Sequence, residues 1–338
     1  MKISKSESSE SIEILEKLAD RFERASISES TRRAYERDWM HFWKFCRRHN
    51  LTDLPASEDT VVLYLTSMTE ENLSVSTIAR RCTSITAIHR ASGNVSPIKT
   101  DRVNRVMRGI KREMAKPPNR KKALSWKDVK KINSICDSTI IGIRDAAIIT
   151  LGWASALRRS ELVALDLDDL DISKKGIIVR VRRSKTDQEG EGALIGIPRS
   201  HDDCCPVVAV ERWIARLDVS KTDKKQIPLF VKIGNGGRGR WWWLPCGDRL
   251  SSRSISNIVK HYVFLAGLPA DLYSAHSLRR GLATDAGAVG VPERVISRHT
   301  RHKSIHVLRG YIEDGTIWHD NPLPTIYGSS SSSSSSLE

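Results

Sequence analysis

Two basic clusters in the second half of the sequence place cations where packing alone does not require them. In "ALRRSELVAL", Arg158 and Arg159 interrupt an apolar run, and Glu161 follows Arg158 by three residues. That spacing lets the carboxylate hold the Arg158 guanidinium. In "HSLRRG", His276 and Arg279 stand at i and i+3, on one face of a predicted helix. Guanidinium groups bind phosphate oxygens two at a time, so both clusters predict an oxyanion site.

Two further stretches could supply the reacting groups. "RRSKTDQ" presents Lys185 in a polar loop, and "TRHKSIHVLRGYIED" places Tyr311 nine residues after His302. A tyrosine hydroxyl is a poor nucleophile unless surrounding cations favour the phenolate. Lysine can protonate a leaving alkoxide, and histidine can exchange a proton near neutral pH. With the arginines offsetting the charge of a phosphorane, the set predicts phosphoryl transfer without a metal or another cofactor.

Each of these residues has a simpler explanation when it is taken singly. A lone arginine is more often a structural ion pair or a solvated charge, and a lysine in a hairpin loop is more often a surface residue. A lone histidine can cap a helix or lie in the core, and most tyrosines are packing residues. The joint pattern is what favours a site.

The composition indicates a polyanionic partner. Lys plus Arg number 55 against 40 Asp plus Glu, giving a net charge of +15 and a sequence pI near 9.7. Such an excess favours nucleic acid. Apolar runs stay shorter than the ~20 residues that span a bilayer, the N-terminus does not resemble a secretory signal, and a membrane partner is not expected. The six cysteines lack zinc or CxxC spacing, which favours reduced thiols and a cytoplasmic location.

Apolar spacing predicts two domains. Residues 12 to about 115 are expected to be helical, with clear helices over 28–50, 57–71, 74–93 and 100–115. "KPPNRKKALSW" combines two prolines with a basic cluster and no apolar period, which indicates a linker with a boundary near Pro117.

The second domain mixes helices with two strands, expected over 177–182 and 193–197 and joined by a polar loop. Its helices are expected over 125–136, 141–157, 159–165, 207–217, 251–268, 276–290 and 292–300. The predicted fold is therefore mainly α with a small antiparallel sheet, in domains 1–117 and 118–327. The Ser-rich tail 328–338 is of low complexity and is expected to lie outside the fold.

The ordered set of motifs resembles the tyrosine recombinase (phage integrase) family, most closely its two-domain Cre-like members, over about residues 28–327. The family motif G-L-R-x-S-E-L resembles "ALRRSEL", which selects Arg158 over Arg159. The hairpin lysine of the family matches Lys185, and its H-x-L-R motif matches His276 and Arg279. Its G-H pair, followed nine residues later by the tyrosine, matches His302 and Tyr311.

The sequence departs from the family pattern in three places. Ala156 and Arg301 stand where the motifs usually have glycine, and Trp241–Trp243 belong to an unusual insertion. The three tryptophans are expected to pack in a hairpin rather than stack on bases.

The resemblance implies a specific chemistry. Tyr311 would attack a scissile phosphodiester of duplex DNA, forming a 3′-phosphotyrosine and freeing a 5′-hydroxyl that Lys185 protonates. Strand exchange would proceed through a Holliday junction without ATP or metal. Arg158 and Arg279 would bind the phosphate, and His276 would act as the general base. His302 would donate a hydrogen bond to the phosphate, and Glu161 would support Arg158.

The resemblance also implies a clamp on double-stranded DNA, in which first-domain helices enter major grooves. The DNA-binding residues expected are Arg32, Arg33, Arg80, Arg81, Lys121 and Lys122, with Arg80 the first choice for a base contact. The alternative is that they touch only phosphate or solvent. The target would carry inverted repeats, with a dimer on each site and a tetramer on paired sites. Exchange of a C-terminal segment would link the subunits through Ile317, Trp318, Leu323 and Ile326; the alternative is packing on their own domain.

Several rival functions remain open at this point. A Xer-like dimer resolvase or a telomere resolvase would use the same chemistry, and a catalytically silent DNA-binding regulator could share the fold. A metal-dependent nuclease is disfavoured because no Asp/Glu cluster of metal-ligand type is apparent. A nucleoid-associated protein of bacterial, plasmid or phage origin is expected.

Overall fold

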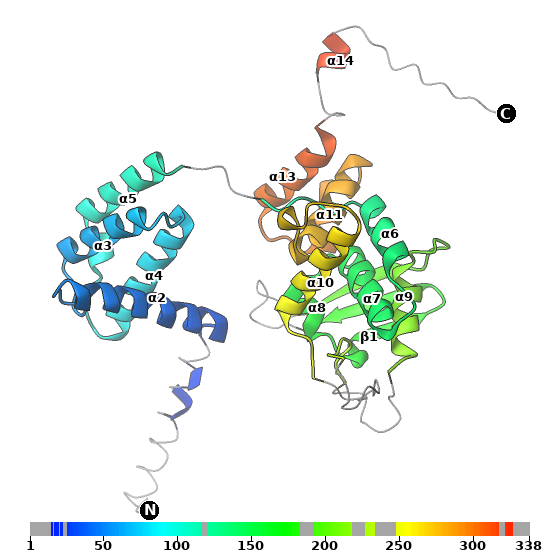
Figure 1. Ribbon diagram of the computed structural model, residues 1–338, viewed down its shortest axis with the longest axis horizontal. Coiled ribbons are helices and arrows are strands. Elements are labelled where there is room, and N and C mark those ends of the chain that lie inside the picture. The colour runs from blue at the N-terminus through cyan, green and yellow to red at the C-terminus, as the bar shows by residue number, and fades with distance from the viewer. Residues whose placement is uncertain are drawn as a thin grey trace, which may run out of the picture. The chain divides into compact units, whose positions relative to one another are not determined.

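The computed structural model describes residues 15, 17–19, 21–22, 26–115, 120–182, 192–217, 227–233, 248–317 and 322–326. The chain forms two compact units, Met1–Pro118 and Asn119–Glu338 (Figure 1). Most of the helix expected before residue 26 and the predicted linker around Pro117 lie outside the described residues. The same holds for Lys185, Trp241–Trp243 and Trp318.

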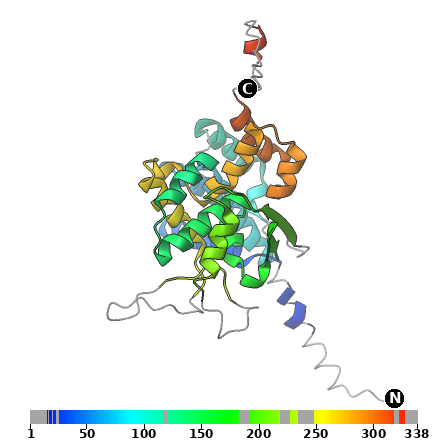
Figure 2. The same ribbon diagram turned by 90° about the vertical axis from the view of Figure 1, so that its right-hand side faces the viewer.

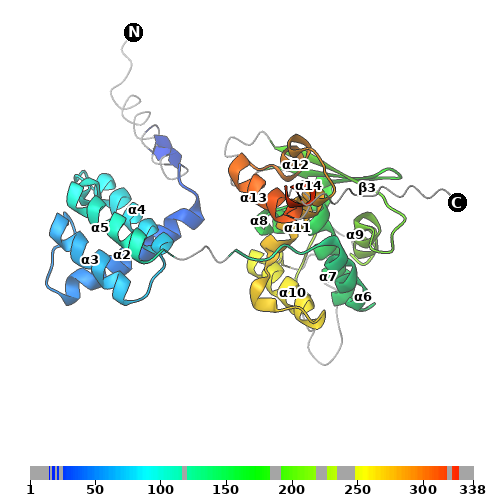
Figure 3. The same ribbon diagram turned by 90° about the horizontal axis from the view of Figure 1, so that it is seen from above.

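The first unit is helical across residues 26–115, as the apolar spacing predicts. Its α-helices are α2 (Glu29–Arg48), α3 (Glu58–Glu70), α4 (Val75–Ala91) and α5 (Asp101–Glu113) (Figures 1 and 3). Each begins after a hydroxyl side chain that accepts a backbone N–H of the first turn: Ser28, Ser57, Ser74 and Thr100. The buried faces meet in one core around Phe42, Tyr64 and Ile78.

The second unit combines helices with a three-stranded antiparallel sheet, and the predicted fold class is confirmed. The described α-helices are α6 (Trp126–Ile135), α7 (Ile140–Ala154), α8 (Arg159–Ala164), α9 (Pro206–Ile214), α10 (Ser252–Leu265), α11 (Ala275–Ala288), α12 (Glu293–Thr300), α13 (Ile305–Thr316) and α14 (Leu323–Ile326).

The sheet runs in the order β1 (Leu170–Ser173), β2 (Gly176–Val181) and β3 (Ala193–Pro198). It lies to one side of the helices of this unit (Figure 2), and its buried residues join the core formed by α7 and α9. The two predicted strands are present. Strand β1 is not predicted by the sequence. It has four residues, which alternate between partly buried and exposed positions.

Helix α11 contributes to two hydrophobic clusters of the second unit. Leu278 on its first half lies in the core with residues of α6, α7 and α10. Ala283 on its second half packs against Ile296 of α12 and Leu308 and Tyr311 of α13. One helix therefore positions the predicted His276–Arg279 pair relative to the tyrosine. None of the helices in the described ranges is long and apolar enough to cross a membrane.

Candidate active site

The first arginine motif lies at a sharp turn between α7 and α8. The sequence predicted separate helices over 141–157 and 159–165, and the break between them is confirmed: α7 ends at Ala154 and α8 begins at Arg159. Ala156 in the turn is fully buried and has φ +49°. Such left-handed backbone disfavours a residue with a Cβ, which explains why the related motif has glycine here.

Glu161 holds Arg158 through both of its oxygens. Oε1 accepts from the Arg158 guanidinium at 2.6 Å, and Oε2 accepts from the Arg158 backbone N–H at 2.9 Å. The carboxylate is buried, so the pair is shielded from solvent screening. Arg159 is exposed instead and points toward Ser256.

Helix α11 brings His276 and Arg279 to the same side, as their spacing predicts. His276 Nε2 lies 3.1 Å from the Tyr311 hydroxyl oxygen. Arg279 is 1% exposed, and it donates to the Ala156 carbonyl at 2.6 Å and to His302 Nε2 at 3.3 Å. Its Nη2 is buried without a partner in the described part of the chain. Burial, and then the nearby Arg158, lowers the pKa of Arg279 to about 10.

Both histidines are held in the neutral form. Burial, followed by the charges of Arg279 and Arg280, lowers the pKa of His276. Burial and then Arg279 lower the pKa of His302 to about 3. His302 Nε2 accepts from Arg279, so the proton is assigned to Nδ1, which lies 2.6 Å from the Thr300 hydroxyl. A neutral His276 can accept the proton of Tyr311.

Tyr311 lies on α13 with its side chain turned inward. It is 9% exposed and packs with Leu308 and Ala283. Its backbone carbonyl accepts from the Thr284 hydroxyl of α11 at 3.1 Å. The nucleophile candidate is therefore docked within its own chain and already touches the candidate base.

Two arginines at the site were missed by sequence reasoning. Arg280 lies with its guanidinium carbon 5.3 Å from the centre of the Tyr311 ring, pairs with Asp314 of α13 and donates to the Lys121 carbonyl. Arg301 donates to Glu161 Oε2 at 2.9 Å. The only sequence signals were the second arginine of "HSLRR" and the arginine standing in the place of a glycine.

The predicted DNA-binding residues are distributed over both units. In the first unit Arg32 is exposed, Arg33 pairs with Glu29, and Arg80 donates to Asp38 at 2.9 Å with 49% of its side chain exposed. Arg81 turns inward, bonding His41 at 2.9 Å. In the second unit Lys121 donates to the Asp271 carbonyl, and Lys122 is exposed. Their contacts with DNA stay predictions.

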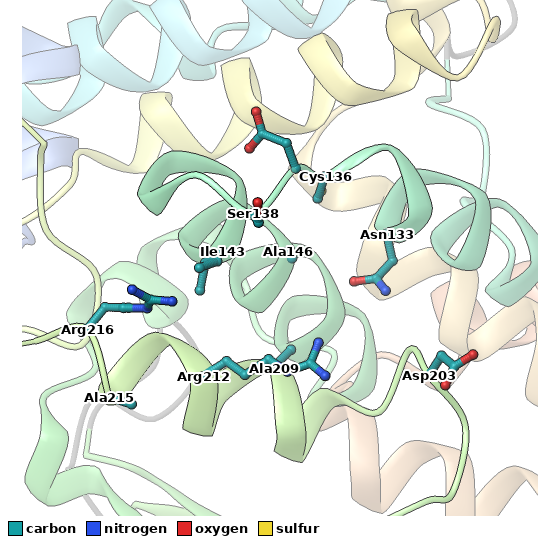
Figure 4. Close-up of a pocket in the computed structure, with 11 residues that line it drawn as sticks. Asn133, Cys136, Ser138, Ile143, Ala146, Asp203, Ala209, Arg212, Ala215 and Arg216 are labelled. Carbon is teal, nitrogen blue, oxygen red and sulfur yellow. The ribbon is translucent and has the colours of Figure 1, made fainter.

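A pocket of the second unit lies away from the candidate active site around Arg158 and Arg279. Asn133 of α6, Ile143 and Ala146 of α7, and Ala209 and Arg212 of α9 line it (Figure 4). Ala154, at the other end of α7, is eight residues beyond Ala146, about 12 Å along the axis. Of the predicted catalytic residues, those that the structure describes do not line this pocket.

Comparison with known proteins identifies relatives over both units. Residues 122–316 match the model of the phage integrase family, and residues 18–92 match that of the phage integrase N-terminal SAM-like domain. An integrase/recombinase xerD homolog from Selenomonas ruminantium is 36% identical over 307 residues, covering 89% of this chain and 86% of the relative. The recombinase cre of Escherichia phage P1 is 24% identical over 320 residues, 89% of each chain.

Solved structures share the fold. The Tn1549 transposon integrase in complex with circular intermediate DNA has a TM-score of 0.57 at 18% identity, covering 87% of this chain and 92% of that one. A lambda integrase dimer bound to a core site has a TM-score of 0.54 at 17% identity, covering 87% and 76%. At these identities the likeness concerns architecture alone.

The contact between Tyr311 and His276 beside the buried Arg279 is compatible with phosphodiester chemistry. The chain belongs to the phage integrase family. Its activity is accordingly that of a tyrosine recombinase, which cleaves and rejoins DNA.

The neutral His302 predicts a loss of stability in acid. Its pKa is about 3 when folded, against 6.5 as the ordinary value, so the unfolded chain takes up a proton first as pH falls below 6.5. The wild type should lose on the order of 1 kcal/mol more than H302Q between pH 7 and pH 5, a shift of about 2–4 °C in melting temperature. Melting curves at both pH values measure this, with exposed His201→Gln as control. The same pH dependence in all three proteins would contradict the assignment.

Proposed function

We propose that the chain is a site-specific recombinase in which Tyr311 attacks a DNA phosphodiester and becomes linked to its 3′-phosphate. The observation that carries this is the 3.1 Å approach of the Tyr311 hydroxyl to a neutral His276, beside Arg279, whose Nη2 has no partner among the residues that the structure describes. A buried donor without a partner is costly, which suits a site that awaits an anionic ligand.

The bonds balance without an external energy source. The Tyr311 oxygen bonds to phosphorus while the bond from phosphorus to the 5′-oxygen breaks. The tyrosine proton passes to His276, and by resemblance Lys185 protonates the leaving oxygen. Arg158 and Arg279 would bind the non-bridging oxygens, where charge accumulates in the transition state. The 5′-hydroxyl of a partner strand then reverses the step, giving a Holliday junction.

The role proposed for His302 requires a change on substrate binding. Its Nε2 is an acceptor for Arg279, so it cannot at the same time donate to a phosphate. A bound phosphate would compete for the Arg279 N–H and, through its negative charge, raise the pKa of His302. We infer that His302 acquires its Nε2 proton when DNA is bound.

Double-stranded DNA is the partner, and the finer assembly is proposed. The net charge of +15 supports extensive phosphate contact, to which exposed Arg32, Arg80 and Lys122 would contribute. We propose a target with inverted repeats, a dimer on each site and a tetramer on paired sites, acting in the bacterial cytoplasm. Ile317 and Ile326 are 62% and 70% exposed. Apolar side chains left uncovered near the C-terminus support exchange of that segment between subunits.

The test is covalent trapping on a nicked substrate whose freed strand end diffuses away. With the cognate site, found as inverted repeats around a short spacer near the gene, the wild type should form a protein–DNA adduct in EDTA. Y311F should form none. Y273F, which removes a phenol from the same unit outside the site, should react like the wild type. Tight binding of the cognate site without an adduct would instead indicate a silent regulator.

A further inference from the structure

Arg301 adopts a backbone conformation that suits glycine. It follows the last residue of α12 with φ 57° and ψ 47°, and its N–H donates to the Ser297 carbonyl at 2.7 Å. The left-handed conformation is unfavourable for a residue with a Cβ, whereas glycine adopts it freely. The backbone alone therefore gives no reason for an arginine here.

The N–H donors of the Arg301 side chain have few hydrogen-bond acceptors in the described part of the protein. It is 15% exposed and donates through Nη2 to Glu161 at 2.9 Å. Within the described ranges its Nε and Nη1 are buried without a partner. Burial lowers the pKa of Arg301, and Glu161 opposes that shift. Desolvating a guanidinium with two unfilled donors is unfavourable, so the side chain adds little to the stability of the free protein.

Glu161 connects Arg301 to the phosphate site. Its Oε1 accepts from the Arg158 guanidinium, and its Oε2 accepts from both the Arg158 backbone and Arg301. If Glu161 had Arg158 as its only cationic partner, the pair would be neutral overall and would attract an anion weakly. With Arg301 sharing the carboxylate, the three groups carry a net positive charge, and Arg158 keeps its orientation.

We propose that Arg301 is a positioning residue for the cleavage reaction: by binding Glu161 it lets that carboxylate orient Arg158 without cancelling the positive charge Arg158 presents to the scissile phosphate. This rests on the proposed function and adds a member to its site. Arg301 acts through Glu161, so its contribution should disappear when Glu161 loses its charge.

The experiment is a double-mutant cycle on single-turnover cleavage of the nicked substrate. R301G should lower the cleavage rate by about 10²-fold, the scale of one lost electrostatic contact, while DNA binding changes by no more than about twofold. Its melting temperature should not fall, because glycine suits the left-handed backbone. In an E161Q background, adding R301G should change the rate by about twofold at most. R298A removes an exposed arginine from the same helix and should cleave like the wild type.

Two outcomes would overturn the inference. R301G could cleave as fast as the wild type, or its effect could multiply with that of E161Q, which would mean that Arg301 acts independently of the carboxylate. R301N, whose side chain also tolerates left-handed backbone, gives a second variant if R301G melts early. Absence of an adduct in the wild type would instead refute the proposed function, so the two failures are distinguishable.

Discussion

Arg279→Met is expected to slow DNA cleavage by about 10³-fold and to leave the protein at least as stable as the wild type. The loss of rate follows from removal of the buried N–H donors that would hold the phosphate oxygens. Stability should be retained because the substitution removes a desolvated cation that Arg158 and Arg301 repel. Methionine fills a similar volume, so no large cavity forms.

The two readouts for this variant are the single-turnover rate and the melting temperature. R279K serves as the comparison, because it keeps the charge but loses the planar fork. A melting temperature that falls together with the rate would show that Arg279 is mainly structural, through its 2.6 Å bond to the Ala156 carbonyl, and would contradict the prediction.

Arg280→Leu is expected to loosen α13 and with it the nucleophile. This guanidinium joins the Tyr311 ring, Asp314 and the Lys121 carbonyl, so one side chain ties α13 to α11 and to the segment that follows the linker. Breaking a largely buried pair costs about 3 kcal/mol, and less here because Asp314 is partly exposed. Cleavage should slow by about 10-fold or more, since a misplaced nucleophile loses its near-attack geometry.

Hydrogen exchange of residues 305–316 measures the loosening directly, and it should rise in R280L. Arg309→Leu is the matched control, because Arg309 also lies on α13 but forms an exposed pair with Glu293, which is worth little. Equal exchange in R280L and R309L would contradict the role given to Arg280.

Helices and their starts were predictable from local signals. Ser28, Ser57, Ser74 and Thr100 mark helix beginnings because their hydroxyls bond backbone within the same turn. The break between α7 and α8 was predicted as well, but the left-handed backbone of Ala156 at that break was not, because a residue with a Cβ disfavours it.

In the site, too, contacts between residues close in sequence were predictable and contacts between distant residues were not. The Arg158–Glu161 contact and the shared face of His276 and Arg279 depend on spacing within a few residues. Arg280 meets Asp314 across 34 positions and Arg301 meets Glu161 across 140. The first pairing requires α11 and α13 to pack together, and the second requires α8 to meet the end of α12, so no local pattern could indicate them.

The most direct test of the central claim is to identify the linkage in the trapped adduct. After protease digestion, mass spectrometry should find the 3′-phosphate of the cleaved strand on the tyrosine of the peptide that contains Tyr311, with a free 5′-hydroxyl on the released strand. A linkage to another residue, a 5′-phosphate on the protein, or cleaved DNA with no protein attached would contradict the account.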